Sequence, residues 1–208
     1  LGPYMNEAGF LLEEGNSIES VDKAMVAFGM PMGPLALLDE VGLDVAAKAG
    51  AVLSKAFGER MVPSKAIEKL LADGRLGKKN GKGVYAYAEG KRKDPDPSVY
   101  QVAGVGPAHP ADAQAVVERM VLAMINEAAL ILDEKIVASA PELDLAMIMG
   151  TGFPPFRGGL LRYADSLSLT HVVTRLRELA AKVGPRFTPT APLVRLAESG
   201  RHFYEAYP

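Results

Sequence analysis

The 208-residue chain contains no cysteine. It therefore has no disulfide framework, no thiolate metal site and no cysteine nucleophile, a usage that fits a reducing compartment. It also lacks an excess of charge of either sign, because 23 lysines and arginines offset 25 acidic residues and leave a formal net charge of −2. General polyanion binders are rich in lysine and arginine, so we expect no nucleic-acid partner.

Long apolar runs are missing as well. No run approaches the roughly 20 residues that a membrane-spanning helix needs, so we expect no membrane span. The N-terminal residues have neither the basic nor the apolar region of a signal peptide. The chain begins with Leu1 rather than methionine, which predicts that it is a piece of a longer polypeptide.

Apolar residues recur every three or four positions along most of the chain, a spacing typical of amphipathic helices. The longest such stretch runs from Ala111 to Glu134. Further helices are expected at Val45–Phe57, Ser64–Asp73, Leu143–Met149 and Thr170–Val183. Only Val84–Tyr87 has an extended pattern, and it is too short and isolated to predict a sheet. The predicted fold class is therefore all-α.

A stretch of different composition separates two helical halves. Residues 89–110 contain four prolines and few apolar side chains, which is typical of a linker. We therefore expect a first helical copy at residues 1–88, a linker at 89–110 and a second, degenerate helical copy at 111–208.

The two halves carry similar short motifs in the same order. The distance between matching motifs drifts only from 120 to 126 residues, and a collinear series of this kind indicates an internal repeat. The matched pairs are Asn6–Ala8 with Asn126–Ala128, Asp22–Met25 with Asp144–Met147, Gly29–Pro31 with Gly152–Pro154, Asp39 with Asp165, Arg60–Pro63 with Arg186–Pro189, and Asp73–Arg75 with Ser199–Arg201. The sequence thus predicts two tandem copies of one helical unit.

One predicted turn between helices has an unusual composition. The segment Gly29–Pro34 holds two glycines, two prolines and two methionines in six residues. A rigid connector is one interpretation, because Gly29 can end a helix with a positive φ and Pro34 suits the first turn of the next helix. The other interpretation is a loop lining an apolar pocket, since methionine adapts to ligands of different shape. The candidate substrate-binding residues are Met30, Pro31, Met32, Gly33 and Pro34.

Two further segments resemble phosphate-binding or dinucleotide-binding loops. Gly77–Gly83 is rich in glycine and lysine, and it is either an anion-binding nest or a solvated turn. It lacks the spacing of a P-loop. Gly150–Gly152 superficially begins a dinucleotide fingerprint, but it follows a predicted helix rather than a strand, so we reject it.

No complete catalytic constellation is visible. His109, His171 and His202 are scattered, and none pairs with a carboxylate at a recognisable catalytic spacing. Glu7 and Glu127 lie at the edge of an apolar helix stripe, where a structural hydrogen bond and a catalytic role both stay open. No metal-ligand cluster is visible. We therefore predict no catalytic, cofactor-binding or metal-binding residue within this chain.

The motifs nevertheless resemble one family. Pro3–Ala8, Gly29–Pro34, Leu38–Asp44 and Gly77–Tyr85 are similar to the C-terminal domain of 3-hydroxyacyl-CoA dehydrogenases. The second half resembles the degenerate second copy of that domain in the multifunctional fatty-acid oxidation enzyme, the α-subunit of the bacterial complex. The motifs of this half are Glu118–Met120, Asn126–Glu127, Asp144 and Gly152–Gly159. The resemblance covers nearly the whole chain.

This resemblance implies that the chain is the C-terminal part of a larger enzyme that oxidises 3-hydroxyacyl-CoA to 3-ketoacyl-CoA with NAD. In the family, the NAD-binding Rossmann domain and the catalytic His–Glu pair precede this region, as does an enoyl-CoA hydratase domain in the multifunctional form. The implied roles of this chain are closure of the acyl-CoA site and domain packing, so we expect the chain alone to be inactive. The implied partners are those domains, with a thiolase subunit as a further candidate. The implied location is cytoplasmic in a bacterium, and mitochondrial or peroxisomal in a eukaryote.

Two other functions stay open at this point. The chain could be a non-catalytic helical interaction or scaffold module, or a nucleotide-binding regulator that uses the lysine-rich loop. The lack of a predicted sheet and of P-loop spacing weighs against the regulator.

Overall fold

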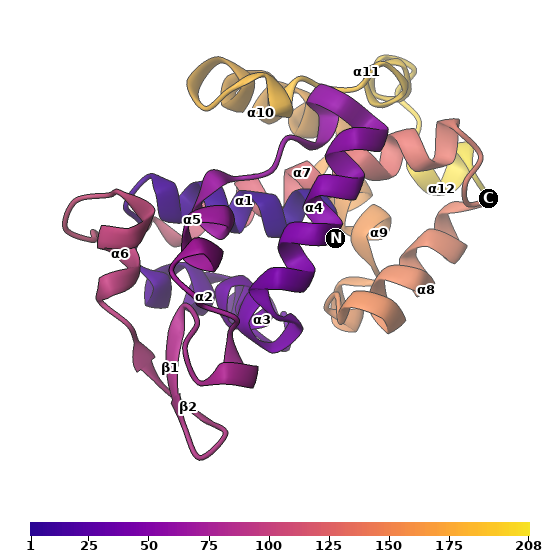
Figure 1. The fold of residues 1–208 in the computed structure, drawn as a ribbon. Coiled ribbons are helices and arrows are strands. Elements are labelled where there is room, and N and C mark those ends of the chain that lie inside the picture. The colour runs from indigo at the N-terminus through magenta and orange to yellow at the C-terminus, as the bar shows by residue number, and fades with distance from the viewer. The chain divides into compact units, whose positions relative to one another are not determined.

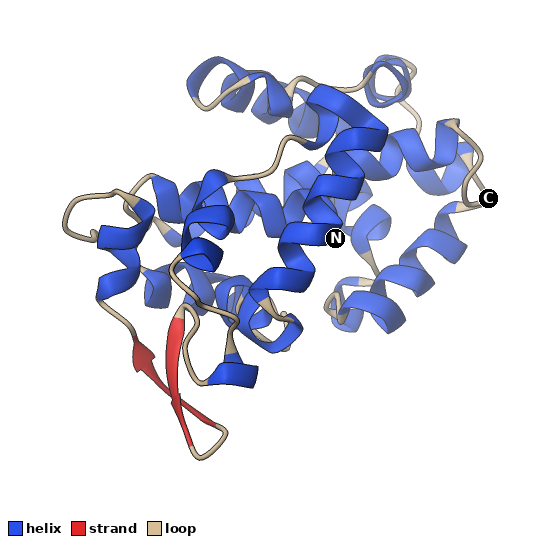
Figure 2. Cartoon of the chain, in the orientation of Figure 1, coloured by secondary structure: helices blue, strands red, loops and turns tan.

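The computed structural model describes residues 1–208. Its fold is all-α, as predicted, with one small hairpin as the exception (Figures 1 and 2). The chain divides into two compact units. Unit 1 comprises Leu1, Gly29–Pro31 and Glu118–Pro208, and unit 2 comprises Gly2–Phe28 and Met32–Val117.

Unit 2 is built from helices around an apolar core. The helices are α1 (Gly2–Glu13), α2 (Ile18–Phe28), α3 (Pro34–Val41), α4 (Leu43–Phe57), α5 (Lys65–Ala72), α6 (Ser98–Ala103) and the start of α7 (Ala113–Asp133). Ser64 caps α5 by accepting the Ala66 N–H, as its sequence predicts. Fully buried core side chains include Tyr4, Leu12, Ile18, Met25, Leu35, Leu38 and Leu70.

The prediction that Val84–Tyr87 contributes to no sheet is wrong. Strand β1 (Tyr85–Ala88) pairs antiparallel with β2 (Lys91–Pro95), and Figure 2 shows the two strands as a hairpin. The connecting residues Glu89 and Gly90 both have positive φ, 52° and 72°, as two-residue hairpin turns often require. Glutamate rarely adopts this conformation, so the turn has no recognisable sequence pattern. Strand β2 has none either, because it is mostly charged.

The segment expected to be a linker contains regular structure. Besides β2 it holds α6, whose residue Ala103 accepts a 2.5 Å hydrogen bond from Lys69 Nζ. Farther along, the His109 N–H donates to the Gly15 carbonyl at 2.9 Å. Residues 89–110 therefore pack within unit 2, and the division into residues 1–88, 89–110 and 111–208 stays a prediction.

Unit 1 contains most of α7 and five later helices. These are α8 (Ala140–Thr151), α9 (Leu160–Leu167), α10 (Leu169–Lys182), α11 (Ala191–Glu198) and α12 (Phe203–Ala206). Ser139 caps α8 by accepting the Glu142 N–H. Phe153, Phe187 and Phe203 are fully buried. A helix suited to crossing a bilayer is not found anywhere in the chain.

Candidate functional site

The Gly29–Pro34 turn joins α2 to α3. Gly29 follows α2 with a φ of 122° and Pro34 opens α3, as expected of a connector between helices. Met30 is buried, with 4% of its surface exposed. Pro31 is exposed and Met32 is half-buried. The turn therefore has one packed and one partly accessible methionine.

A buried carboxylate on α2 holds the end of this turn. Asp22 accepts hydrogen bonds from the backbone N–H groups of Leu35 at 2.8 Å and Ala36 at 3.0 Å. These are two of the donors that α3 leaves unpaired at its N-terminus. A Cβ on Gly33 would lie 2.2 Å from Cγ of Asp22, so a larger residue than glycine does not fit beside the carboxylate.

The hairpin contributes a third bond to the same carboxylate. The Tyr85 hydroxyl donates to Oδ2 of Asp22 at 2.7 Å. Burial raises the pKa of Asp22, and the hydrogen bonds from Tyr85 and from the α3 backbone oppose that rise. Burial and the nearby Asp22 carboxylate also raise the pKa of Tyr85, so its hydroxyl stays protonated and keeps donating. Asp22 therefore ties α2, the turn and the hairpin together.

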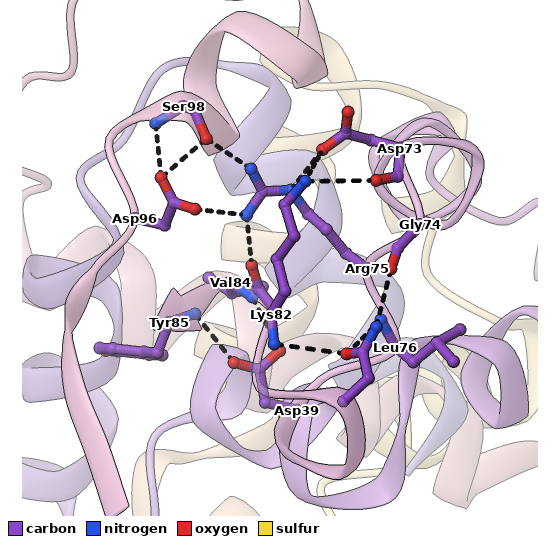
Figure 3. Close-up of polar contacts among 12 residues, drawn as sticks. Asp39, Asp73, Gly74, Arg75, Leu76, Lys82, Val84, Tyr85, Asp96 and Ser98 are labelled. Atoms are coloured by element: carbon purple, nitrogen blue, oxygen red, sulfur yellow. Dashed lines mark hydrogen bonds and ion pairs between the residues drawn. The ribbon is translucent and has the colours of Figure 1, made fainter. Parts of the chain in front are cut away.

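A second buried carboxylate, Asp39 of α3, fixes the start of β1. It accepts the N–H groups of Val84 and Tyr85, each at 2.8 Å (Figure 3). A Cβ on Gly83 would lie 2.1 Å from Oδ1 of Asp39, which explains the glycine before the strand. Burial raises the pKa of Asp39, against the effect of these bonds.

Arg75 is a deeply buried charge of unit 2, with 1% of its surface exposed. Figure 3 shows its guanidinium surrounded by acceptors. It donates to the Gly83 carbonyl and to Asp96 at 2.8 Å, to Asp73 at 2.9 Å and to Ser98 at 2.5 Å. A buried guanidinium needs partners for its donors, and Arg75 finds them within unit 2. It therefore stabilises the hairpin and offers no free charge to a ligand.

The lysine-rich loop Gly77–Gly83 pairs its charges with carboxylates of the same unit. The three pairs are Lys78 with Glu40 at 2.8 Å, Lys79 with Asp44, and Lys82 with Asp73 at 3.0 Å. Each lysine is thus offset by a neighbouring negative charge, so the loop lacks the concentrated positive field of an anion site. This favours the solvated turn over the anion nest and removes the main support for a nucleotide-binding regulator.

The second copy repeats the Asp22 arrangement with its own residues. Asp144 of α8 accepts the N–H groups of Leu161 at 2.6 Å and Arg162 at 3.0 Å, and the Tyr204 hydroxyl donates to it at 2.9 Å. A Cβ on Gly159 would lie 2.3 Å from Cγ of Asp144. Burial, together with Asp144, raises the pKa of Tyr204 to about 12.

Two further bonds recur at matching positions. Asp165 accepts the N–H groups of Phe203 and Tyr204, as Asp39 does for the start of β1. The amides of Asn6 and Asn126 donate to the carbonyls of Val62 and Thr188, respectively. Equivalent residues therefore make equivalent bonds, which is what two copies of one fold require.

An open groove of about 480 Å³ lies beside the turn, between α2 and β2. Of the five candidate substrate-binding residues, Gly33 alone lines it. The lining residues carry equal numbers of positive and negative charges. The positive residues are Lys23, Arg92 and Lys93, and the negative residues are Glu19, Asp22 and Asp94. The groove therefore has no strong preference for a ligand of one charge.

Met30 and Pro31 lie in unit 1 instead. In that unit, a Cβ on Gly152 would come within 2.7 Å of Cγ of Pro31. A Cβ on Gly29 would come within 2.7 Å of Cζ of Phe156. Met32, Gly33 and Pro34 belong to unit 2, so the five candidate residues divide between the two units.

One histidine lies near a carboxylate, which the sequence spacing does not reveal. Nδ1 of His202 is 3.7 Å from Oδ1 of Asp165. Asp165 already accepts two backbone N–H groups at the start of α12. The pair therefore lies at the N-terminus of this last helix. No group of three or more metal-ligating side chains occurs in the chain.

Comparison with known proteins places this geometry in context. The family described as 3-hydroxyacyl-CoA dehydrogenase, C-terminal domain, matches residues 1–87 and 116–205. The fatty acid oxidation complex subunit alpha of Shewanella loihica is 50% identical over 206 residues. The match covers 99% of this chain but 29% of that relative, so the chain spans less than a third of the relative's length.

Two solved structures share the fold. The 3-hydroxybutyryl-CoA dehydrogenase from Escherichia coli K12 aligns with a TM-score of 0.73 at 22% identity, over 100% of this chain and 59% of that chain. The dehydrogenase part of multifunctional enzyme 1 from C. elegans aligns with a TM-score of 0.64 at 21% identity, over 92% and 46%. The family match occupies most of the chain, in two stretches that each contain the bonded carboxylate, turn and tyrosine described above. The chain belongs to the 3-hydroxyacyl-CoA dehydrogenase C-terminal domain family.

Proposed function

We propose that the chain is the C-terminal part of a fatty-acid β-oxidation enzyme, an NAD-dependent 3-hydroxyacyl-CoA dehydrogenase. The observation that carries this proposal is the 50% identity with a fatty acid oxidation complex subunit alpha across 99% of the chain. The acyl-CoA substrate, the Rossmann and hydratase domains as intramolecular partners, and a thiolase subunit as a further partner are parts of the same proposal. Because that relative is bacterial, the proposed location is the cytoplasm.

NAD does not fit the residues of this chain. A dinucleotide site of the Rossmann type uses a glycine-rich turn between a parallel strand and a helix. Here Gly150–Gly152 ends α8, with Gly152 as its left-handed cap at a φ of 71°. The sheet is an antiparallel hairpin of two strands. We therefore assign NAD binding and hydride transfer to residues outside this chain.

The proposed contribution of this chain is a rigid apolar turn beside the acyl group. Asp22 and Tyr85 fix the Gly33 end of the turn through hydrogen bonds of 2.7 to 3.0 Å. Met32 stays half-buried, so part of its flexible thioether side chain can meet a substrate. These features support a pocket-lining role for Met32, Gly33 and Pro34 in the larger enzyme, and the proposal extends the same role to Met30 and Pro31.

A scaffold module without ligand contact is the competing function. The lysines of Gly77–Gly83 favour it, because each of them is paired with a carboxylate of the same unit. The two functions differ in what a change at the turn does to catalysis.

Steady-state kinetics of the full-length parent enzyme, with and without Met32→Ala, tests the proposal. The parent should oxidise 3-hydroxyacyl-CoA with NAD⁺, whereas this chain alone should not. In the parent, Met32→Ala should raise KM for acyl-CoA and leave KM for NAD⁺ unchanged. Truncation of a fully buried methionine to alanine costs about 2–5 kcal/mol, and Met32 is half-buried, so a change of roughly tenfold in kcat/KM is expected.

Ile136→Ala is the control, because Ile136 is an exposed apolar residue that does not line the groove beside the turn. It should leave both KM values unchanged. If Met32→Ala lowers Tm but leaves KM and kcat unaltered across chain lengths, the turn is a connector and the scaffold function is correct. Activity of this chain alone would contradict the assignment of catalysis to residues outside it.

A further inference from the structure

Helix α4 exposes an apolar stripe along its length. Val45, Ala49, Val52 and Ala56 recur at i, i+4, i+7 and i+11, so they share one face of the helix. All four are exposed, with Val45 at 47% and Val52 at 68%. We call these four residues the α4 stripe. It extends over about 16 Å, or three helical turns.

The second copy provides an internal comparison for this stripe. An offset of 126 residues relates Asp39 to Asp165 before the helix and Val62 to Thr188 after it, so α4 and α10 align without a gap. The positions of α10 equivalent to the α4 stripe are His171, Arg175, Glu178 and Lys182. The same face of the same fold is therefore polar and charged in one copy and apolar in the other.

The inward faces of the two helices show the reverse difference, since the inward face of α10 is the more apolar of the two. Helix α10 buries Leu169, Val172, Val173, Leu176 and Leu179. The equivalent residues of α4 are Leu43, Ala46, Ala47, Gly50 and Leu53, of which Leu43 alone is buried. Helix α4 thus carries less apolar bulk toward its own unit and more toward the outside. The fold does not require an apolar outward face on this helix, because the outward face of α10 is polar and charged. Contact with a surface outside the unit is therefore the better explanation of the exposed apolar residues of α4.

The charges beside the α4 stripe indicate the chemistry of that surface. Lys48 and Lys55 are exposed on the same helix, seven residues apart, and neither has a salt-bridge partner. The lysines of Gly77–Gly83, by contrast, are all paired with carboxylates. An apolar seam with two free lysines along one edge is complementary to an apolar seam with acidic side chains along one edge.

We propose that the α4 stripe docks an amphipathic helix whose acidic residues meet Lys48 and Lys55. The occupant belongs to the part of the parent polypeptide that lies outside this chain. This rests on the proposed function, in which the chain is one part of a larger enzyme, and on the relative of which more than two thirds lies outside the matched region. Ala49 and Ala56 are small enough for a second helix to approach to about 8 Å between axes.

Thiol labelling of the full-length parent tests the docking. This chain has no cysteine, so Val52→Cys and Glu178→Cys place single thiols at equivalent positions of α4 and α10. Peptide mapping separates them from any thiol elsewhere in the parent, and labelling after denaturation corrects for intrinsic reactivity. The thiol at position 52 should react at least about tenfold more slowly than the thiol at 178 in the native parent. Equal rates at the two positions would overturn the docking.

Carbodiimide cross-linking identifies the occupant, since it joins a lysine amine to a carboxylate in contact with it. Cross-links should run from Lys48 or Lys55 to aspartate or glutamate of the same polypeptide outside this chain, and they should disappear in Lys48→Gln and Lys55→Gln. Links to a second copy or to a separate subunit, or a protected position 52 with no link at all, would overturn this occupant. If the parent oxidises 3-hydroxyacyl-CoA while position 52 labels freely, the docking fails and the proposed function stands.

Discussion

Replacing Asp22 with asparagine tests whether the buried carboxylate holds the turn. Asp22 accepts three hydrogen bonds, from the Leu35 and Ala36 N–H groups and from the Tyr85 hydroxyl. Asparagine has one oxygen acceptor, and its other polar atom is a donor. If the oxygen keeps the Leu35 bond, the amide nitrogen faces the Ala36 N–H and one buried donor loses its partner. The Tyr85 hydroxyl can rotate and accept, so its bond survives.

The cost follows from that single lost acceptor. An unpaired buried donor costs about 1–3 kcal/mol, and 1 kcal/mol corresponds to about 2–4 °C in Tm for a chain of this size. Asp22→Asn should therefore lower Tm by roughly 2–12 °C in calorimetry. Asp94→Asn makes the same chemical change at an exposed residue of the same groove and should cost less than about 0.5 kcal/mol. Equal losses for the two variants would refute the reasoning.

The pH dependence of Asp22→Asn gives a second check. Burial raises the folded-state pKa of Asp22 above its ordinary value of 3.8. A carboxyl with a raised pKa binds its proton more tightly in the folded state, so its contribution to stability is fully present below the unfolded pKa and is lost as pH rises through the folded pKa. Asparagine does not titrate. The stability advantage of Asp22 over asparagine should therefore be larger near pH 4 than at pH 7, and an advantage that grows with pH would contradict burial as the main cause.

Two backbone positions yield further predictions. Gly33→Ala should destabilise the chain by about 1–3 kcal/mol, because its Cβ would overlap Asp22. Gly106→Ala, where nothing lies within 4 Å, should have little effect in the same urea titration, and similar losses would argue against the overlap. Ser168 has a φ of 69° where the first copy has Gly42, so Ser168→Gly should relieve about 1–3 kcal/mol of strain. The flexibility of glycine in the unfolded chain offsets about 0.4–1 kcal/mol of that, so an unchanged or lower Tm would show that the conformation is not strained.

The parts of the fold that depend on local signals could be predicted from the sequence. Helical periodicity gives the all-α class, and the hydroxyls of Ser64 and Ser139 mark the starts of α5 and α8 because a cap acts within a few residues. The hairpin could not be predicted, because its turn places Glu89 at a positive φ that glutamate rarely adopts. Its strands are stabilised instead by distant groups such as Asp39, which is 45 residues from Val84.

In the candidate site, too, local features could be predicted from the sequence and contacts between distant residues could not. The composition of Gly29–Pro34 marks the turn, and the repeat marks Asp22 as one of a matched pair. Their connection depends on Tyr85, which is 63 residues from Asp22, and no local pattern reports a bond over that distance. The lysine-rich loop is the converse case, because its local composition indicates an anion site while carboxylates up to 38 residues away neutralise it.

Comparison of the two copies separates the shared fold from what distinguishes them. Asp39 and Val84 are 45 residues apart, whereas Asp165 and its partner Phe203 are 38 apart. The seven-residue difference equals the length of Gly77–Gly83, so the loop is an addition between two bonded points that both copies keep. The buried carboxylates maintain the same fold in both copies. Loops and outward faces lie outside these bonds, so their residues can differ between the copies. Residues that differ between the copies at such places, including the outward face of α4, are therefore the better candidates for functions specific to one copy.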